Sequence, residues 1–117
     1  MGLDFSHSEA HWSYSGFNRF RERLARLDGH NLREMWENEY NGIADYKDLP
    51  MYDFYFHSDC DGQLTPEQME RMLPRFRELI KLMEDEGIED DWDVESATML
   101  ANDMEDCIAD GMNMEFC

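Results

Sequence analysis

The segment from Thr65 to Gly87 constrains the fold most, because it combines a helix start signal with a long apolar stripe. Thr65, followed three residues later by Gln68, is typical of a capping box, and Pro66 suits the first helical position. Apolar side chains then recur at helical spacing: Met69, Met72, Leu73, Phe76, Leu79, Ile80 and Met83. We therefore expect a helix that ends at Gly87 and is kinked by Pro74.

Weaker patterns predict the other elements. Helical periodicity indicates helices over residues 17–28, 31–41 and 93–110, each followed by a glycine within two residues. Alternating or aromatic-rich runs predict short strands over residues 1–6, 51–57 and 112–117. We expect an α+β fold, with three to four helices packed on a small, mostly antiparallel sheet of about three short strands. The 117 residues fit a single domain spanning residues 1–117.

Hydropathy and cysteine usage favour a protein of the cytoplasm. No apolar run approaches the ~18 residues that span a membrane, and no basic, apolar leader pattern is found at the start. Three cysteines, an odd number, favour free thiols: Cys60, Cys107 and Cys117. Hydrophobic residues make up 42% of the chain and aromatic residues 13%, so we expect a packed core despite the formal net charge of −18.

That net charge is unevenly distributed. Residues 1–36 contain five acids and five bases, and residues 37–70 contain nine acids and one base. Residues 71–81 have four bases and one acid, whereas residues 82–117 have thirteen acids and no base. The bases of the third segment are expected to pair with the protein's own acids: Arg71, Arg75, Arg77 and Lys81. The acidic segments disfavour direct binding of nucleic acid or membranes, and they favour basic protein surfaces and cations.

The last predicted helix carries three acids on one side, separated by about 4.5 and 6 Å along its axis. These steps are of the same order as the ~3.4 Å between phosphates of one DNA strand. With the acids that precede this helix, they make up the candidate partner-binding residues: Asp90, Asp91, Asp93, Asp103, Asp106 and Asp110. Two other interpretations are a solvated outer face and halophilic adaptation, since lysine occurs only at Lys47 and Lys81.

A metal-binding module is the first alternative. The sequence HSDCDGQLTPEQ, residues 57–68, contains the middle of a calcium loop, and its candidate ligands for calcium or zinc are His57, Asp59 and Asp61. The ends of the loop pattern are missing, because a histidine replaces the first aspartate and a glutamine the bidentate glutamate. An Asp-Gly turn feeding a helix is therefore the favoured interpretation. His7 and His11 are spaced as two zinc ligands on a helix would be. We expect no cofactor unless one of these places binds calcium or zinc.

The second alternative is a small ligand-binding or enzymatic domain. Its pocket would be lined by Trp12, Tyr14 and the aromatic strand over residues 51–57. Aromatic side chains in a small domain belong to the core more often than to a groove. No nucleophile–base motif and no P-loop pattern is found in the sequence, so we expect that the protein is not an enzyme.

Two stretches resemble small hypothetical proteins of bacteriophage and prophage genomes. The start MGLDF is similar to the MGLD start of those proteins, and HSDCDGQLTPEQMERMLPRF resembles their turn followed by a capped amphipathic helix. The resemblance implies a phage or bacterial setting and transfers no functional residues. The leading expectation is a phage-type inhibitor in the cytoplasm of a bacterial host. It would present a carboxylate-rich surface that mimics nucleic acid to a basic surface of a host defence or nucleic-acid-binding protein.

Overall fold

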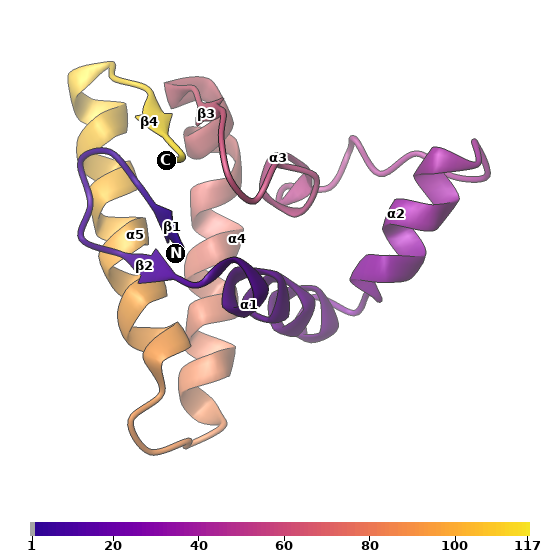
Figure 1. The fold of residues 1–117 in the computed structure, drawn as a ribbon, viewed down its shortest axis with the longest axis horizontal. Coiled ribbons are helices and arrows are strands. Elements are labelled where there is room, and N and C mark those ends of the chain that lie inside the picture. The colour runs from indigo at the N-terminus through magenta and orange to yellow at the C-terminus, as the bar shows by residue number, and fades with distance from the viewer. Residues whose placement is uncertain (1) are drawn as a thin grey trace.

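The computed structural model describes residues 2–117 and contains helices and short strands (Figure 1). The helices are α1 (Tyr14–Leu27), α2 (Leu32–Tyr40), α3 (Tyr52–Tyr55), α4 (Pro66–Asp85) and α5 (Trp92–Asp110). The strands are β1 (Leu3–Asp4), β2 (His11–Trp12), β3 (Gln63–Leu64) and β4 (Met114–Glu115). The expected α+β class is confirmed, but residues 2–117 form five helices where three to four were expected.

The strands form two antiparallel pairs in place of the single sheet expected from the sequence. β1 pairs with β2, and β3 pairs with β4. The inward-facing partners are Leu3 with Trp12 and Leu64 with Met114. A bridge between Phe5 and Phe116 lies between the pairs, and Cys117 N donates to the carbonyl oxygen of Asp4 at 2.8 Å. The first and last strands are therefore brought to the same part of the molecule (Figure 1).

Residues 51–57 contain helix α3, so the strand expected there is wrong. Phe54 and Tyr55 are neighbours in the chain and are both fully buried. A strand would send them to opposite faces, whereas a helical turn can bury both against one core. The rings of Tyr52 and Phe56, four residues apart, stack with centroids 4.6 Å apart, which is a helical spacing.

The buried side chain of Arg21 completes the end of α3. The last carbonyl groups of a helix have no partner within the helix. Arg21 Nη1 donates to the carbonyl oxygens of Phe54, Tyr55 and His57 at 3.2, 3.4 and 2.6 Å. Burial lowers the pKa of Arg21 to about 10, and the charge of Asp59 opposes that shift. These donors come from α1, so a local pattern in residues 51–57 could not indicate them.

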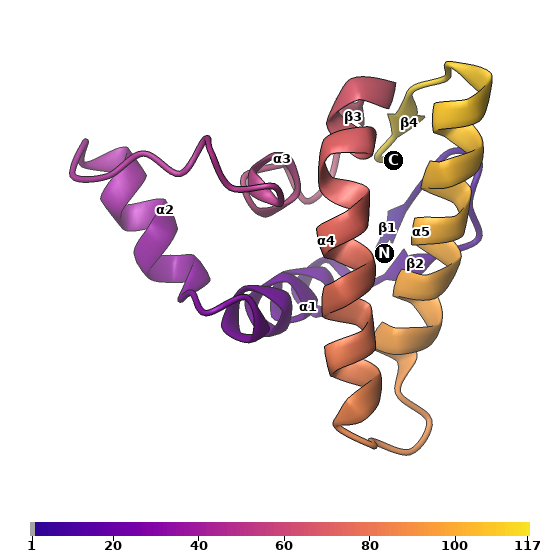
Figure 2. The same ribbon diagram turned by 180° about the vertical axis from the view of Figure 1, so that it is seen from behind.

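Helices α4 and α5 run antiparallel and side by side (Figures 1 and 2). The start of α4 is as expected: Thr65 Oγ1 accepts from Gln68 N at 3.3 Å, and Gln68 Oε1 accepts from Thr65 N at 2.9 Å. Pro74 lies inside α4, and the helix continues unbroken across it. The buried side of α4 consists of Met69, Met72, Phe76, Leu79, Ile80 and Met83. The predicted apolar stripe is thus confirmed except at Leu73, which is partly buried.

An aromatic cluster joins these elements into one core. It contains Phe5, Trp12, Phe17, Phe20, Phe54, Phe76 and Phe116. Trp12 stacks on Phe20 with ring centroids 4.4 Å apart. Helix α2 lies apart from the α4–α5 pair, at the far end of the molecule in both ribbon views (Figures 1 and 2). None of the helices in residues 2–117 is long and apolar enough to cross a membrane.

Candidate functional site

The candidate partner-binding surface is the outer side of α5. The opposite side of this helix is buried through Ser96, Ala97, Leu100, Ala101, Met104 and Cys107. That burial fixes the rotation of the helix about its axis, so that Asp106 and Asp110 are exposed and Asp103 is half-buried. Residues separated by three and four positions lie on one helix face. The structure therefore brings these three carboxylates together, as their sequence spacing predicted.

The charge of this acidic face is not compensated locally. Within residues 2–117, Asp103, Asp106 and Asp110 have no basic side chain at salt-bridge distance. Burial raises the pKa of the Cys107 thiol, and the charges of the same three carboxylates raise it further.

Of the other three candidate partner-binding acids, one forms no ion pair in residues 2–117 and two are engaged. Asp90 is exposed, in the loop before α5. Asp91 accepts from Arg23 Nη2 at 2.8 Å, and Asp93 accepts from Arg23 Nη1 at 3.1 Å and from Trp12 Nε1 at 3.0 Å. The hydrogen bonds from Arg23 hold the pKa of Asp91 below its usual value. Asp91 and Asp93 therefore tie the start of α5 to α1, and an external partner would have to compete with Arg23 for them.

The bases of α4 pair mainly within the molecule, as expected. Arg75 Nη2 lies 2.6 Å from Asp28 Oδ1, Arg77 Nη2 lies 2.6 Å from Glu105 Oε2, and Lys81 Nζ lies 3.8 Å from Asp85 Oδ1. Arg71 differs, because it donates to the backbone carbonyl oxygens of Lys47 and Leu49. The bases of α4 thus join this helix to its neighbours. Of the acids of α5, only Glu105 pairs with one of them.

The turn over residues 57–62 has the geometry of a hydrogen-bonded turn. The ring nitrogens of His57 lie 3.0 Å from Ser58 O and 2.9 Å from Gln63 O. Asp59 accepts from Asn18 Nδ2 at 3.1 Å. The hydroxyl of Ser58 accepts from the backbone N–H groups of Cys60 and Asp61. A metal ion at His57 would have to displace one of the ring contacts.

The two other histidine candidates lie on different backbone structures. His7 has a positive φ of 63° and His11 is in β2, so the two histidines do not share a helix face, as a zinc pair with this spacing would. His11 Nδ1 lies 2.7 Å from Asp4 Oδ1. Within residues 2–117, no group of three or more histidine, cysteine, aspartate or glutamate side chains is placed to hold a metal ion.

The aromatic residues proposed for a ligand pocket belong largely to the core. Trp12 is 3% exposed and packs on Phe20, and residues 51–57 form α3 in place of one wall of the expected groove. A cavity of about 330 Å³ does border Trp12, between the start of α1 and the start of α5. Tyr14 and residues 51–57 do not line it. The geometry therefore does not assemble the aromatic pocket that the sequence suggested.

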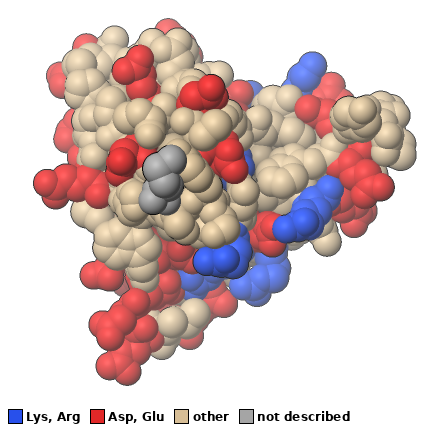
Figure 3. Space-filling view, viewed as in Figure 1, with Lys and Arg blue, Asp and Glu red and all other residues tan. Residues whose placement is uncertain are grey.

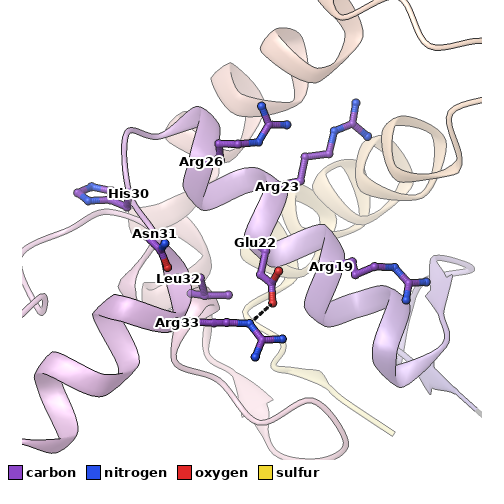
Figure 4. A pocket seen from close by; sticks show the side chains of 8 residues that line it. All are labelled: Arg19, Glu22, Arg23, Arg26, His30, Asn31, Leu32 and Arg33. Carbon is purple, nitrogen blue, oxygen red and sulfur yellow. Dashed lines mark hydrogen bonds and ion pairs between the residues drawn. The ribbon is translucent and has the colours of Figure 1, made fainter.

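Sequence reasoning missed a basic cavity of about 520 Å³ beside α1 and the start of α2. Four of its lining residues are arginines: Arg19, Arg23, Arg26 and Arg33. Figure 4 shows Arg33 of α2 reaching Glu22 of α1, whose carboxylate it contacts at 3.0 Å. The signal available in the sequence was the run of five arginines between residues 19 and 33. Five acids balance these arginines within the first 36 residues, so the net charge of that segment does not indicate a basic surface.

Comparisons of this chain with protein-family models, with curated proteins and with solved structures find no match.

Proposed function

We propose that this protein is a small acidic binding protein that docks the outer face of α5 on a basic surface of a nucleic-acid-binding protein. The acidic face consists of Asp103, Asp106 and Asp110, with Asp90 at the preceding loop. The resemblance to phage proteins adds the setting of this proposal, a bacterial cell in which the partner is a host defence protein. The mode of action is inhibition, because an occupied basic surface cannot bind nucleic acid.

The observation that carries the proposal is the unpaired state of these acids beside well-paired bases. Arg75 and Arg77 each bind an acid of the same protein, while Asp103, Asp106 and Asp110 have no such partner in residues 2–117. Figure 3 shows acidic side chains along the α5 edge, at the loop between α4 and α5 and over α2, whereas the basic side chains lie mainly over α1 and α2. A surface of one sign raises the rate and selectivity of encounter with a surface of opposite sign.

The acidic face also has the rigidity that mimicry of a polyanion requires. Its carboxylates are spaced by a regular helix of 19 residues whose opposite side is fully packed. An acidic face that is only solvated, and binds no partner, would show the same pattern of buried and exposed residues. Removal of its charge would then change solubility and leave partner binding unchanged, which gives the experiment its decisive comparison.

The test begins with the recovery of partners from a nuclease-treated bacterial lysate on the immobilised protein. Affinity for each purified partner is then measured between about 50 and 200 mM salt. We expect affinity to fall with salt and duplex DNA to compete for the same surface. Asp103→Asn, Asp106→Asn and Asp110→Asn combined should weaken binding about tenfold, because each of the three surface charges contributes about 0.5 kcal/mol.

The matched control neutralises three exposed acids elsewhere. Glu37→Gln, Asp48→Asn and Glu70→Gln combined produce the same net charge from α2, a loop and α4. We expect this variant to bind within twofold of the unmodified protein. Equal losses in the two triple variants, affinity that does not depend on salt, or failure to recover any nucleic-acid-binding partner would each contradict the proposal.

A further inference from the structure

The basic cavity beside α1 and α2 lies apart from the acidic face and is not used by the proposed function. Its volume of about 520 Å³ is in the range of small-molecule sites, which is roughly 300–1,000 Å³. Arg19, Glu22 and Arg26 reach it from α1, and Arg33 from the first turn of α2. Figure 4 shows Glu22 and Arg33 meeting between the two helices, with Arg19, Arg23 and Arg26 extending from α1 away from this contact.

Arg23 is held by Glu86, Asp91 and Asp93, whereas the other three arginines of this cavity have fewer or more exposed ion pairs. Arg19 forms no ion pair within residues 2–117, and Arg26 reaches only Glu86, at 3.6 Å, with its side chain 63% exposed. Arg33 holds Glu22 at 3.0 Å, but its side chain is 79% exposed. A chain with 28 acids could neutralise all ten of its bases. The exposed guanidinium group of Arg19, which has no ion pair in residues 2–117, therefore contributes an uncompensated positive charge to the cavity.

The backbone at the start of α2 adds partial positive charge to the same cavity. The first N–H groups of a helix have no acceptor within it, and they favour a bound anion. The N-cap residue, Asn31, accepts from the backbone N–H of Glu34 at 3.1 Å, so it leaves the N–H groups of Leu32 and Arg33 unpaired by the cap. Asn31, Leu32 and Arg33 all line the cavity. Two guanidinium groups and a helix start thus border the same space.

We propose that this cavity binds a small phosphorylated ligand, with its phosphate between Arg19 and Arg33. Guanidinium groups match the oxygens of a phosphate in pairs, and two of them balance its charge. The cavity is larger than a phosphate ion, so an organic group occupies the remainder, beside Leu32 and the half-buried His30. Glu22 is the internal competitor: its carboxylate occupies the guanidinium of Arg33 until the phosphate replaces it.

The competing role of Glu22 gives a test that misfolding cannot imitate. Binding of ADP, inorganic phosphate and adenosine is measured by titration calorimetry up to about 5 mM, the weak end of the range for specific ligands. Glu22→Gln should strengthen ADP binding about three- to tenfold, because it frees Arg33 without removing a donor. Arg19→Gln and Arg33→Gln should each weaken ADP binding at least tenfold. ADP should bind more tightly than inorganic phosphate, since it also fills the rest of the cavity.

Two matched controls lie on α4, outside the cavity. Glu78→Gln and Arg77→Gln change an acid and a base that form ion pairs of their own, and both should leave ADP affinity within twofold. The proposal is overturned by the absence of ADP binding to both the unmodified protein and Glu22→Gln. It is also overturned by an equal loss in Arg77→Gln and Arg19→Gln, or by adenosine binding as tightly as ADP. Tighter binding of a single-stranded oligonucleotide than of ADP would assign the cavity to nucleic acid instead.

Discussion

Asp28 lies at the junction of three helices, and its removal should be among the most damaging single changes in the protein. Its Oδ1 accepts from Arg75 Nε at 2.8 Å and lies 2.6 Å from Arg75 Nη2, and its Oδ2 accepts from the hydroxyl of Tyr55 at 3.0 Å. Asp28 caps the end of α1, while Tyr55 belongs to α3 and Arg75 to α4. Burial raises the pKa of Tyr55, and the charge and hydrogen bond of Asp28 raise it further, so the hydroxyl remains a donor.

The expected loss of stability in Asp28→Ala has two parts. The Asp28 side chain is 10% exposed and that of Arg75 33%, so their paired contact is partly shielded from solvent and contributes about 2 kcal/mol. The hydroxyl of the fully buried Tyr55 would lose its acceptor, at a further cost of about 1–2 kcal/mol. Removal of an acid near the C-terminus of α1 returns a few tenths of a kcal/mol. The free energy of unfolding should therefore fall by about 3–4 kcal/mol.

Urea unfolding followed by circular dichroism measures this loss. With a slope of about 2 kcal/mol per M, the midpoint should fall by roughly 1.5–2 M. Glu78→Ala removes the other, exposed partner of Arg75 and should cost less than about 0.5 kcal/mol. A double-mutant cycle with Tyr55→Phe should give a coupling of at least about 1 kcal/mol. The reasoning is refuted if Asp28→Ala costs less than about 1 kcal/mol, or no more than Glu78→Ala.

Two further predictions concern titration and thiol reactivity. The hydrogen bonds from Arg23 lower the pKa of Asp91 in the folded state. The contribution of Asp91 to the free energy of unfolding is therefore present above its unfolded pKa of about 3.9, and it is lost as the pH falls through its folded pKa. Asp91→Asn should therefore lose less stability than the unmodified protein when urea midpoints are compared from about pH 6 down to pH 2, and parallel curves would contradict this. All three cysteines are free thiols, and Cys60 and Cys117 are exposed whereas Cys107 is buried with a raised pKa. A thiol reagent should modify two cysteines in the native protein and the third only on unfolding, and fast reaction of all three would contradict the burial of Cys107.

The helices with complete local signals were predictable from the sequence. Helix α4 carries its start signal, its apolar stripe and its terminating glycine within one segment, so no distant residue is needed to specify it. The same holds for the end of α5 at Gly111, whose φ of 65° suits glycine. The free state of the cysteines was also predicted correctly from their odd number.

The segment over residues 51–57 was not predictable, because its structure depends on a distant side chain. Alternating aromatic residues favour a strand when only neighbours are considered. In the folded protein, Arg21 supplies donors to three carbonyl groups at the end of α3, and Trp36 Nε1 donates to the carbonyl oxygen of Tyr55 at 2.9 Å. The strand pairs were predictable only in part: β1 and β4 lie within the strands expected over residues 1–6 and 112–117, whereas β2 and β3 were not expected. Strands β2 and β3 have two residues each, too few to show a periodic pattern, and β3 pairs with a strand at the other end of the chain.

The acidic residues show where a local pattern stops being informative. The grouping of Asp103, Asp106 and Asp110 follows from helix geometry alone, and the fold preserves it. Asp91 and Asp93 are also aspartates and lie at the start of the same helix, yet they bind Arg23 of α1. Charge counted along the chain cannot separate a free carboxylate from a paired one, because ion pairs form between residues that the fold brings together.

The sequence by itself determined the α+β class, the long capped helix, the free thiols and the acidic side of the last helix. Each of these depends on residues within a few positions of one another, where backbone geometry fixes which side chains meet. Only the tertiary structure decided the helical state of residues 52–55, the pairing of the short strands, and which acids remain free. It alone brought Arg19 of α1 and Arg33 of α2 to the lining of one cavity with four arginines in an acidic protein. These features depend on contacts between residues far apart in the sequence. Such contacts stabilise the structure only after the fold has brought those residues together.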